Sequence, residues 1–277
     1  MFAKNSSDLK NSGTINLADG LSENEPNIGM YTNDDNTKIT NDKDIIGGNN
    51  TYGIYGKKVD LNATGKIKVG DNSVGIFGKE IVQKGTVTVG NNSVGVYGIN
   101  ESEIENSGSI LITSTDNDSK SVGILADKGT ATNKGTIKVD GGKSAGMLGL
   151  NGATIANDAT TGVITITGDA SAGMYVENSL PSNAGTINIE SNRSAGIFAK
   201  ITDAVTRNIE NTGTIKLGGT AKTESVGMYA EIGSTATGTT TLDNKNQITV
   251  EQEKSVGMFV KNGTNDRTKG KALNNTT

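Results

Sequence analysis

The side chains of this sequence that could perform acid–base or nucleophilic chemistry are carboxylates, hydroxyls and amines, because the chain contains no histidine and no cysteine. A serine or cysteine nucleophile activated by histidine cannot be built within it, and the usual zinc-binding signatures are absent. Paired carboxylates alone can hydrolyse glycosidic bonds. The densest acidic group, Asp34, Asp35, Asp42 and Asp44, lies in a loop-rich segment without catalytic spacing, so we expect a solvated loop there.

Two short runs have the composition of weak cation-binding loops, namely Gly70-Asp71-Asn72 and Asp116-Asn117-Asp118. The calcium-binding nonapeptide of RTX proteins never occurs in full. No glycine-rich run continues into the Gly-Lys-Ser/Thr of a phosphate loop. The sequence therefore predicts no metal and no cofactor, and we interpret both runs as turns.

Charge and hydropathy argue against two further classes of protein. The net charge is −4 with a pI near 5.1, and the chain lacks the basic stripe that a nucleic-acid backbone requires. No stretch approaches the roughly 18 apolar residues of a membrane-spanning helix. We expect no nucleic-acid partner and no direct membrane contact.

Three short motifs recur in a fixed order from one end of the chain to the other. The first is small-x-Gly-aliphatic-aromatic, as in Ser73 to Phe77. The second, Gly-Thr-aliphatic-polar-aliphatic, is found at Gly185 to Ile189, and the third, aliphatic-polar-Asn, at Ile209 to Asn211. The period is 20 to 31 residues, measured between the glycines of the first motif at positions 29, 53, 75, 95, 123, 146, 173, 196, 227 and 257.

A repeat of this length, with strand-forming residues and no helical spacing, is typical of a solenoid whose every repeat is one turn. The fold class predicted for residues 1–277 is all-β: one continuous, single-stranded parallel β-helix with three short strands per coil and about ten coils. Strict alternation in the second motif predicts two ladders that point inward. They are Ile15, Ile67, Val87, Ile110, Ile137, Ile164, Ile187, Ile215 and Ile248, and Leu17, Val69, Val89, Ile112, Val139, Ile166, Ile189, Leu217 and Val250.

Both ends of the chain fall inside a coil, which suggests a slice of a longer repeat. Met1-Phe2 matches the end of the first motif, and Leu273-Asn274-Asn275 matches the third motif without the strand that should follow. Exposed strand edges favour pairing with other chains. We therefore expect the isolated slice to associate end to end.

Two columns of equivalent residues should have distinct roles. The Asn-x-Gly corners, such as Asn211-Thr212-Gly213, suit a tight bend with positive φ at glycine, and stacked asparagine amides could bond from coil to coil. The aromatic column could pack inward if the chain bends at Gly75, or form an outer stripe suited to sugars. Leucine at 125 and 148 and the mixture of Phe and Tyr favour inward packing.

The first and second motifs together resemble the passenger region of the very large type V autotransporter adhesins of fusobacteria, the RadD-like group. The resemblance covers essentially the whole chain. It implies a right-handed β-helix that an N-terminal signal and a C-terminal β-barrel, both outside this chain, carry to the bacterial surface at the outer membrane. It also implies adhesion to other bacteria or to host cells, through a protein or glycan receptor.

Function on a solenoid is expected in insertions, because the coil core is committed to stacking. The insertions are Asp19 to Asn27, Thr113 to Lys120, Gly218 to Glu224 and Glu231 to Thr240. The first three precede the first motif and should line one edge of the rod. The predicted partner-binding residues are Asp116, Asn117, Asp118, Lys120, Lys222 and Glu224.

Two functions from different classes remain open. The leading one is a non-enzymatic adhesive rod or stalk on the bacterial surface, and the alternative is a carbohydrate-active β-helix enzyme that acts on polysaccharide. A cleft lined by paired carboxylates and aromatic rings would favour the enzyme. A smooth rod with polar ladders would favour the stalk.

Overall fold

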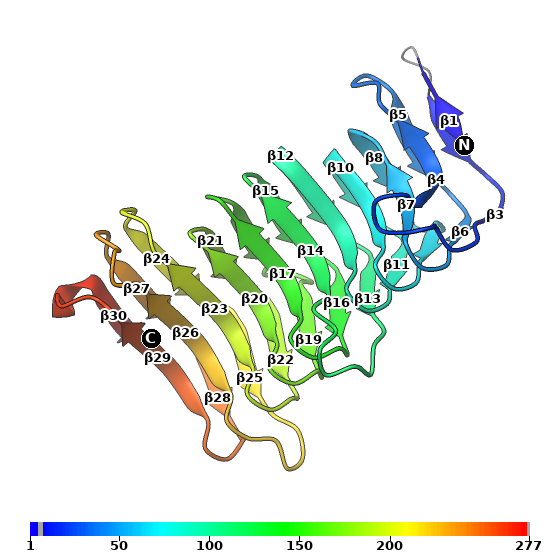
Figure 1. Cartoon of the computed structure of the whole chain (residues 1–277). Helices are drawn as coiled ribbons and strands as arrows, with labels where there is room; N and C mark the ends of the chain where they lie inside the picture. The colour runs from blue at the N-terminus through cyan, green and yellow to red at the C-terminus, as the bar shows by residue number, and fades with distance from the viewer. Residues whose placement is uncertain (5–7, 276–277) are drawn as a thin grey trace.

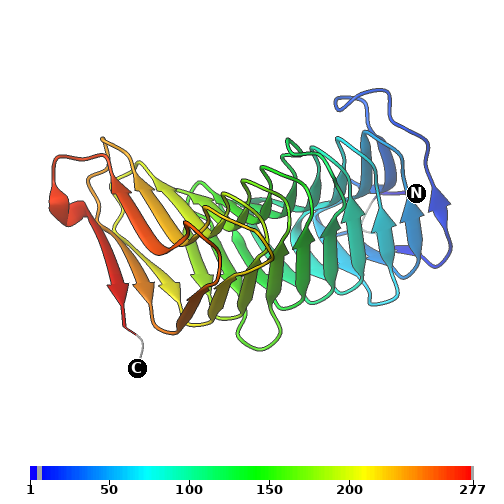
Figure 2. The ribbon, with the colours of Figure 1, turned by 90° about the horizontal axis from the view of Figure 1, so that it is seen from below.

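The computed structural model of the chain describes residues 1–4 and 8–275 and consists of short strands stacked into a rod (Figures 1 and 2). Each coil has three strands in a fixed order, which we call the first, second and third columns. In the first column are β1 (Phe2–Ala3), β4 (Asn27–Thr32), β7 (Thr51–Tyr55), β10 (Val74–Gln83), β12 (Val94–Asn106), β14 (Val122–Asp127), β17 (Ala145–Leu150), β20 (Ala172–Glu177), β23 (Ala195–Ile201), β26 (Val226–Ile232) and β29 (Val256–Asn262).

The second and third columns follow the third and second sequence motifs. In the second column are β2 (Leu9–Asn11), β5 (Lys38–Asn41), β8 (Lys58–Leu61), the distal parts of β10 and β12, β15 (Thr130–Asn133), β18 (Thr154–Asn157), β21 (Leu180–Asn183), β24 (Arg207–Asn211), β27 (Thr240–Asn244) and β30 (Gly270–Asn274). In the third are β3 (Ile15–Asn16), β6 (Asp44–Ile46), β9 (Lys66–Lys68), β11 (Thr86–Val89), β13 (Ser109–Ile112), β16 (Thr136–Val139), β19 (Val163–Ile166), β22 (Thr186–Ile189), β25 (Thr214–Leu217) and β28 (Gln247–Val250). A 3-10 turn, η1 (Arg267–Lys269), precedes β30.

Each strand pairs in parallel with its equivalent one coil away, so the predicted parallel β-solenoid of about ten coils is confirmed. The third column forms one ten-stranded sheet, and the first two columns share a twenty-stranded sheet. Register is strict: Ile164 pairs with Ile187, and Ile187 with Ile215. With about 4.8 Å per coil, the rod is about 50 Å long.

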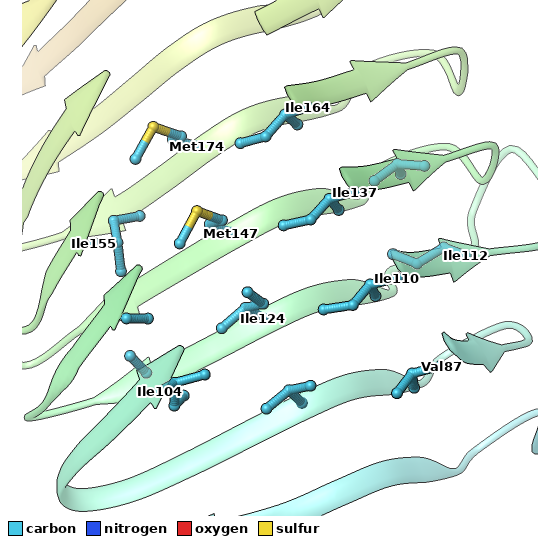
Figure 3. Packing of buried hydrophobic residues seen from close by; sticks show 14 of the residues in the cluster. Val87, Ile104, Ile110, Ile112, Ile124, Ile137, Met147, Ile155, Ile164 and Met174 are labelled. Atoms are coloured by element: carbon cyan, nitrogen blue, oxygen red, sulfur yellow. The ribbon is translucent and has the colours of Figure 1, made fainter. Parts of the chain in front are cut away.

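The two predicted inward ladders are buried along the rod. Figure 3 shows Val87, Ile110, Ile137 and Ile164 stacked beside Ile124 and Met147 from the first column. Burial decreases where the described coils end: Leu17 is partly buried and Val250 is 39% exposed. A coil thus depends on its neighbours to remove its apolar side chains from water.

The aromatic column lies on the outer face of the rod, so the prediction of inward packing was wrong. Gly75 and Ile76 both face the core, because the chain bends at the glycine; a Cβ on Gly75 would lie 2.5 Å from a methyl of Val87. The bend shifts the alternation by one residue, and Phe77 points outward. The rings are half-buried by contact with one another, as between Tyr55 and Phe77, whose centroids are 4.5 Å apart.

The glycines of the Asn-x-Gly corners, apart from Gly13 in the first described coil, allow close approach of successive coils, and none of these corners has the positive φ that the sequence suggested. The two glycines with positive φ among the described residues are Gly152 and Gly219, neither at such a corner. A Cβ on Gly135 would lie 2.1 Å from the carbonyl oxygen of Gly108 in the preceding coil. Side chains are excluded there because the backbones of successive coils nearly touch.

A buried ladder of asparagine amides runs along the same corner, as the sequence suggested. Each amide nitrogen donates to the amide oxygen one coil further on, with Nδ2–Oδ1 distances of 2.6 to 2.8 Å. The asparagine ladder comprises Asn106, Asn133, Asn157, Asn183, Asn211, Asn244 and Asn274. Leu61 and Gln83 occupy its register in the preceding coils, where the Gln83 amide donates to the carbonyl of Gly85 at 2.9 Å.

Replacement of Asn157 by alanine is expected to lower the free energy of unfolding by about 2 kcal/mol, because it leaves buried amide groups of two neighbours short of a partner. Asn133 loses its acceptor at 2.8 Å, and Asn183 loses its donor at 2.8 Å. Urea unfolding followed by circular dichroism measures the change. Asn188→Ala, on the outer face of β22, is the control and should shift stability by less than about 0.5 kcal/mol. Equal effects of the two variants would contradict an energetic role for the ladder.

Candidate functional site

An open groove of about 650 Å³ runs along the first column in the C-terminal half of the rod. It has a floor of small apolar side chains, a wall formed by the outward aromatic column and a rim at the corner that leads into each first-column strand. Its charged and aromatic lining residues are Lys120, Lys143, Arg193, Glu224, Tyr175, Phe198, Tyr229 and Phe259. It spans coils from β14 to β29.

The floor is formed by the residue that follows the serine of the first motif. Three successive coils carry alanine there, at Ala145, Ala172 and Ala195, and these residues pair in register. Valine flanks them in the groove at Val122 and Val226. Because alanine ends at Cβ, the three small side chains leave the surface hollow in the middle of the groove.

The same floor position is filled near the N-terminus by Tyr52, which pairs in register with Val74. The Tyr52 ring contacts the rings of Tyr55 and Phe77, with centroids 6.0 and 6.2 Å apart. The fold therefore accommodates a tyrosine at this position, and the hollow results from the alanines.

The aromatic wall is continuous over four coils. Ring centroids are separated by 5.0 Å between Tyr175 and Phe198, 4.8 Å between Phe198 and Tyr229, and 5.5 Å between Tyr229 and Phe259. Such pairs are favourable beyond their buried area. Burial, together with a 2.7 Å hydrogen bond from the Tyr175 hydroxyl to Glu177, raises the pKa of Tyr175, which stays a neutral donor at physiological pH.

The rim consists of residues in the left-handed region, one per coil, immediately before the serine or threonine of the first motif. Lys120, Lys143, Ala170, Arg193 and Glu224 have φ between 51° and 63°. Asparagine, which tolerates this conformation, occupies the same position at 50, 72 and 92. The turn holds each rim side chain at the edge of the groove.

A ladder of serine hydroxyls fixes this corner. The backbone N–H of each serine donates to the hydroxyl of the next: Ser121 to Ser144 at 3.0 Å, Ser144 to Ser171 at 3.0 Å, and Ser171 to Ser194 at 3.1 Å. The hydroxyls are buried and bonded. They position the rim and are not free to bind a ligand.

Basic side chains predominate among the charged groups that line the groove. Asp118 lies between Lys143 and Lys120, at 2.9 and 3.1 Å, and their hydrogen bonds, that of Lys143 first, hold the pKa of the Asp118 carboxyl below its ordinary range. The charge of Arg193 acts on Asp169: burial opposes ionisation of this carboxyl, but hydrogen bonds from Asn192 and the charges of Lys222 and Arg193 lower its pKa. With Asp118 and the lining carboxylate Glu224 both counted against Lys120, Lys143 and Arg193, the groove keeps one positive charge in excess.

Nearby carboxylates outside the lining are engaged by their own neighbours. Asp140 pairs with Lys138 at 2.9 Å. Asp169 accepts hydrogen bonds from the backbone and the amide of Asn192 at 2.9 and 3.0 Å. Asp140 is therefore held by a lysine outside the lining, whereas Asp169 interacts with Asn192 and also with the charge of Arg193.

The predicted binding residues lie on the predicted edge of the rod, and only some of them reach the groove. Lys120 and Glu224 are in its lining, and Asp118 acts on it through the two lysines. Asp116 bonds back onto its own loop, where its carboxylate accepts from the N–H of Asp118 at 2.9 Å. Asn117 packs under Gly142, and Lys222 lies near Asp169. The two groups of predicted residues do not form one site, because three equivalent loops lie between the β13–β14 loop and the β25–β26 loop that carry them.

Sequence reasoning missed the alanine floor, and it kept an outer aromatic stripe only as the less favoured alternative. The available signal was the change from Ser-Val-Gly to Ser-Ala-Gly at residues 144–146, 171–173 and 194–196. Its meaning depends on the bend at the glycine, because only that bend places the middle residue of the motif and the aromatic ring on one outer surface.

The acidic group near residue 40 is not the single solvated loop that the sequence suggested, because β5 separates Asp34 and Asp35 from Asp42, and Asp44 begins β6. Asp42 pairs with Lys10 at 2.9 Å, and Asp34 accepts from the backbone of Asn36 at 2.8 Å.

Within residues 1–4 and 8–275, no three acidic, histidine or cysteine side chains gather closely enough to hold a metal ion. The same residues contain no helix that is long and apolar enough to span a bilayer.

The stacked coils define a parallel β-helix with a lateral groove. The model of one protein family, described as the BigA third pectate lyase-like domain, matches residues 22–160 and again residues 159–270. The chain belongs to this family. The match supports a bacterial surface β-helix domain. No curated protein and no solved structure matches the chain.

Proposed function

We propose that this chain is a segment of a bacterial surface adhesin, exported as the passenger of a type V autotransporter, and that its groove is an attachment surface for another bacterium or a host cell. The observation that carries the proposal is the groove itself. Along much of the rod, outward lysines pair with carboxylates, as Lys134 does with Glu105 at 2.6 Å. The groove, in contrast, presents an unfilled floor of alanines, each exposed by less than 10%, beside half-buried aromatic rings, and a hollow of this kind with apolar walls is typical of binding sites.

Binding without catalysis is the function that the groove chemistry supports best. Glycoside hydrolysis requires two carboxyl groups across the scissile bond. Among the described residues that line the groove, Glu224 is the one carboxylate. An adhesive role needs shape, apolar area and charge, all of which the groove supplies.

Filling the groove is expected to weaken attachment without disturbing the fold. In Ala172→Tyr the new ring would occupy the hollow, as Tyr52 does three floor positions before Val122. Binding of the fluorescently labelled purified chain to intact bacterial and host cells measures attachment. We expect the variant to bind at least about tenfold more weakly than the unmodified chain. Val94→Tyr, at the same floor position outside the groove, is the matched control and should bind like the unmodified chain.

The outcomes separate an attachment surface from a passive stalk. Equal binding by Ala172→Tyr and the unmodified chain would move the attachment surface away from the groove. Replacement of residues 113–120 and 218–224 by short glycine–serine loops then tests the two insertions directly. A folded chain that binds neither kind of cell would overturn the adhesive proposal and leave a spacer.

A further inference from the structure

The loop between β3 and β4, residues 17–26, is an acidic hairpin on the same corner as the groove rim. Leu21 and Glu25 are joined by a backbone hydrogen bond of 3.1 Å, and a second of 3.1 Å joins Glu25 to Ser22. Leu21 is 87% exposed, the largest exposure of any bulky apolar side chain among the described residues. The acidic hairpin is the dark blue turn beside β7 in Figure 1.

The acidic hairpin lies along the rim, and its own chain does not bury it. The Glu23 carboxylate accepts a hydrogen bond of 3.3 Å from the amide of Asn92, a rim residue on the coil of β12. The groove begins one coil further on, at Lys120. An acidic loop with a projecting leucine therefore sits next to an empty apolar hollow with a basic rim, on one face of the rod.

The two features are complementary in shape and in charge. A leucine side chain fits a floor where alanine stands in place of valine or tyrosine, and its burial would remove apolar area of both partners from water. Glu23 and Glu25 flank the leucine, and Arg193 flanks the floor beside Lys143, whose charge is shared with Asp118. Complementary charges of this kind set the register and the rate of association.

We propose that the occupant of the groove is the acidic hairpin of a second copy of this chain. This inference rests on the proposed adhesive function and names the partner of the same groove. The hairpin and the groove occupy one face at different heights along the rod. Two copies placed face to face and antiparallel can therefore each insert a hairpin into the groove of the other, and a closed two-fold contact results.

An antiparallel contact is the geometry that two rods adopt when they project toward each other from facing surfaces. The contact would join identical proteins on neighbouring bacteria. Because the two insertions are separated along the axis by about three coils, they also fix the overlap of the rods.

A charge exchange between two variants tests the contact. One variant carries Glu23→Lys and Glu25→Lys, and the other carries Arg193→Glu. Sedimentation velocity of the full chain should show a dimer whose affinity falls as salt rises. Each variant alone should dimerise at least about tenfold more weakly. A mixture of the two should recover the dimer, because both contacts in the mixed pair again join opposite charges.

Two further variants test the apolar part of the contact. Leu21→Ser and Ala172→Tyr should each weaken dimerisation, whereas Val205→Ser, which alters another exposed apolar loop residue at 54% exposure, should not. A dimer whose affinity is the same in all these variants would overturn the proposal and would indicate association through the ends of the rod. A monomeric chain would overturn it as well. Groove-dependent binding to cells by a monomer would leave the adhesive function standing with a different partner.

Discussion

Replacement of Ile187 by aspartate is expected to lower the free energy of unfolding by at least about 4 kcal/mol. Ile187 is fully buried in the middle of an inward ladder, in register with Ile164 and Ile215. A carboxylate there would have no cation and no hydrogen-bond donor. Since each coil is stabilised by its neighbours, the coils on both sides should unfold with it.

Urea and thermal unfolding followed by circular dichroism measure this loss. Burial would raise the pKa of the introduced carboxyl. The destabilisation should therefore be smallest below the pKa of the unfolded chain and should grow as pH rises through the raised, folded-state value. Asn188→Asp places the same charge one residue along β22 on the outer face and should change stability by less than about 0.5 kcal/mol. Similar melting of Ile187→Asp and Asn188→Asp would contradict the structure, in which Ile187 points into the core and Asn188 points outward.

The inward ladders could be predicted from the sequence because alternation and a repeat together fix register. Ile187 and Ile189 alternate with polar residues, and equivalent residues recur in every coil. One face of each short strand must therefore be buried, and stacking aligns the buried positions. The asparagine ladder follows from the same logic, since equivalent amides are placed one strand spacing apart.

The direction of the aromatic column could not be fixed from the sequence, which allowed both an inward column and an outer stripe, because it depends on the geometry of the bend at one glycine. Gly75 and Ile76 both turn inward, which breaks the period of two on which the sequence argument rests. A bend of this kind leaves no signal other than the glycine itself. Once it is present, the rings of Phe77 and its equivalents stack outside the core and form the wall of the groove.

The positive φ of the rim residues could not be predicted from the sequence either. Asparagine at 72 and 92 is compatible with positive φ, but lysine, arginine and alanine adopt it at Lys143, Arg193 and Ala170. For a non-glycine residue this region costs about 1–2 kcal/mol. The serine ladder offsets the cost, because each serine N–H finds a buried hydroxyl in the next coil. Stacking of equivalent coils thus stabilises a positive φ at lysine, alanine and arginine residues, which would not adopt it by their own preference.

The placement of function on the surface follows from the division of roles within a coil. Core residues are constrained by stacking, whereas the floor position faces outward and varies among Tyr52, Val122 and Ala172 without altering register. The insertions of residues 113–120 and 218–224 lie on the same edge of the rod as the groove rim. The groove forms because Ala145, Ala172 and Ala195 occupy the floor position in three successive coils, where other coils carry valine or tyrosine.

Replacement of Gly173 by alanine is the second change expected to have a large effect, about 3 kcal/mol of lost stability. The added Cβ would lie 2.7 Å from the carbonyl oxygen of Gly196 and 2.7 Å from a methyl of Ile187. Both distances are far shorter than a carbon can accept. Gly13→Ala is the control, because a Cβ at Gly13 has no neighbour within 4 Å and its φ is not positive; it should be neutral or slightly stabilising.

A double-mutant cycle shows which of the two contacts excludes the side chain. Ile187→Ala removes the methyl that the new Cβ would strike but leaves the Gly196 carbonyl in place. An osmolyte such as trimethylamine N-oxide keeps the doubly altered chain folded during the measurement. We expect most of the cost of Gly173→Ala to persist in the Ile187→Ala background, because a carbonyl in a parallel ladder cannot move without breaking its own hydrogen bonds. If the cost disappears there, the glycine is required by the side-chain core and not by the spacing between coils.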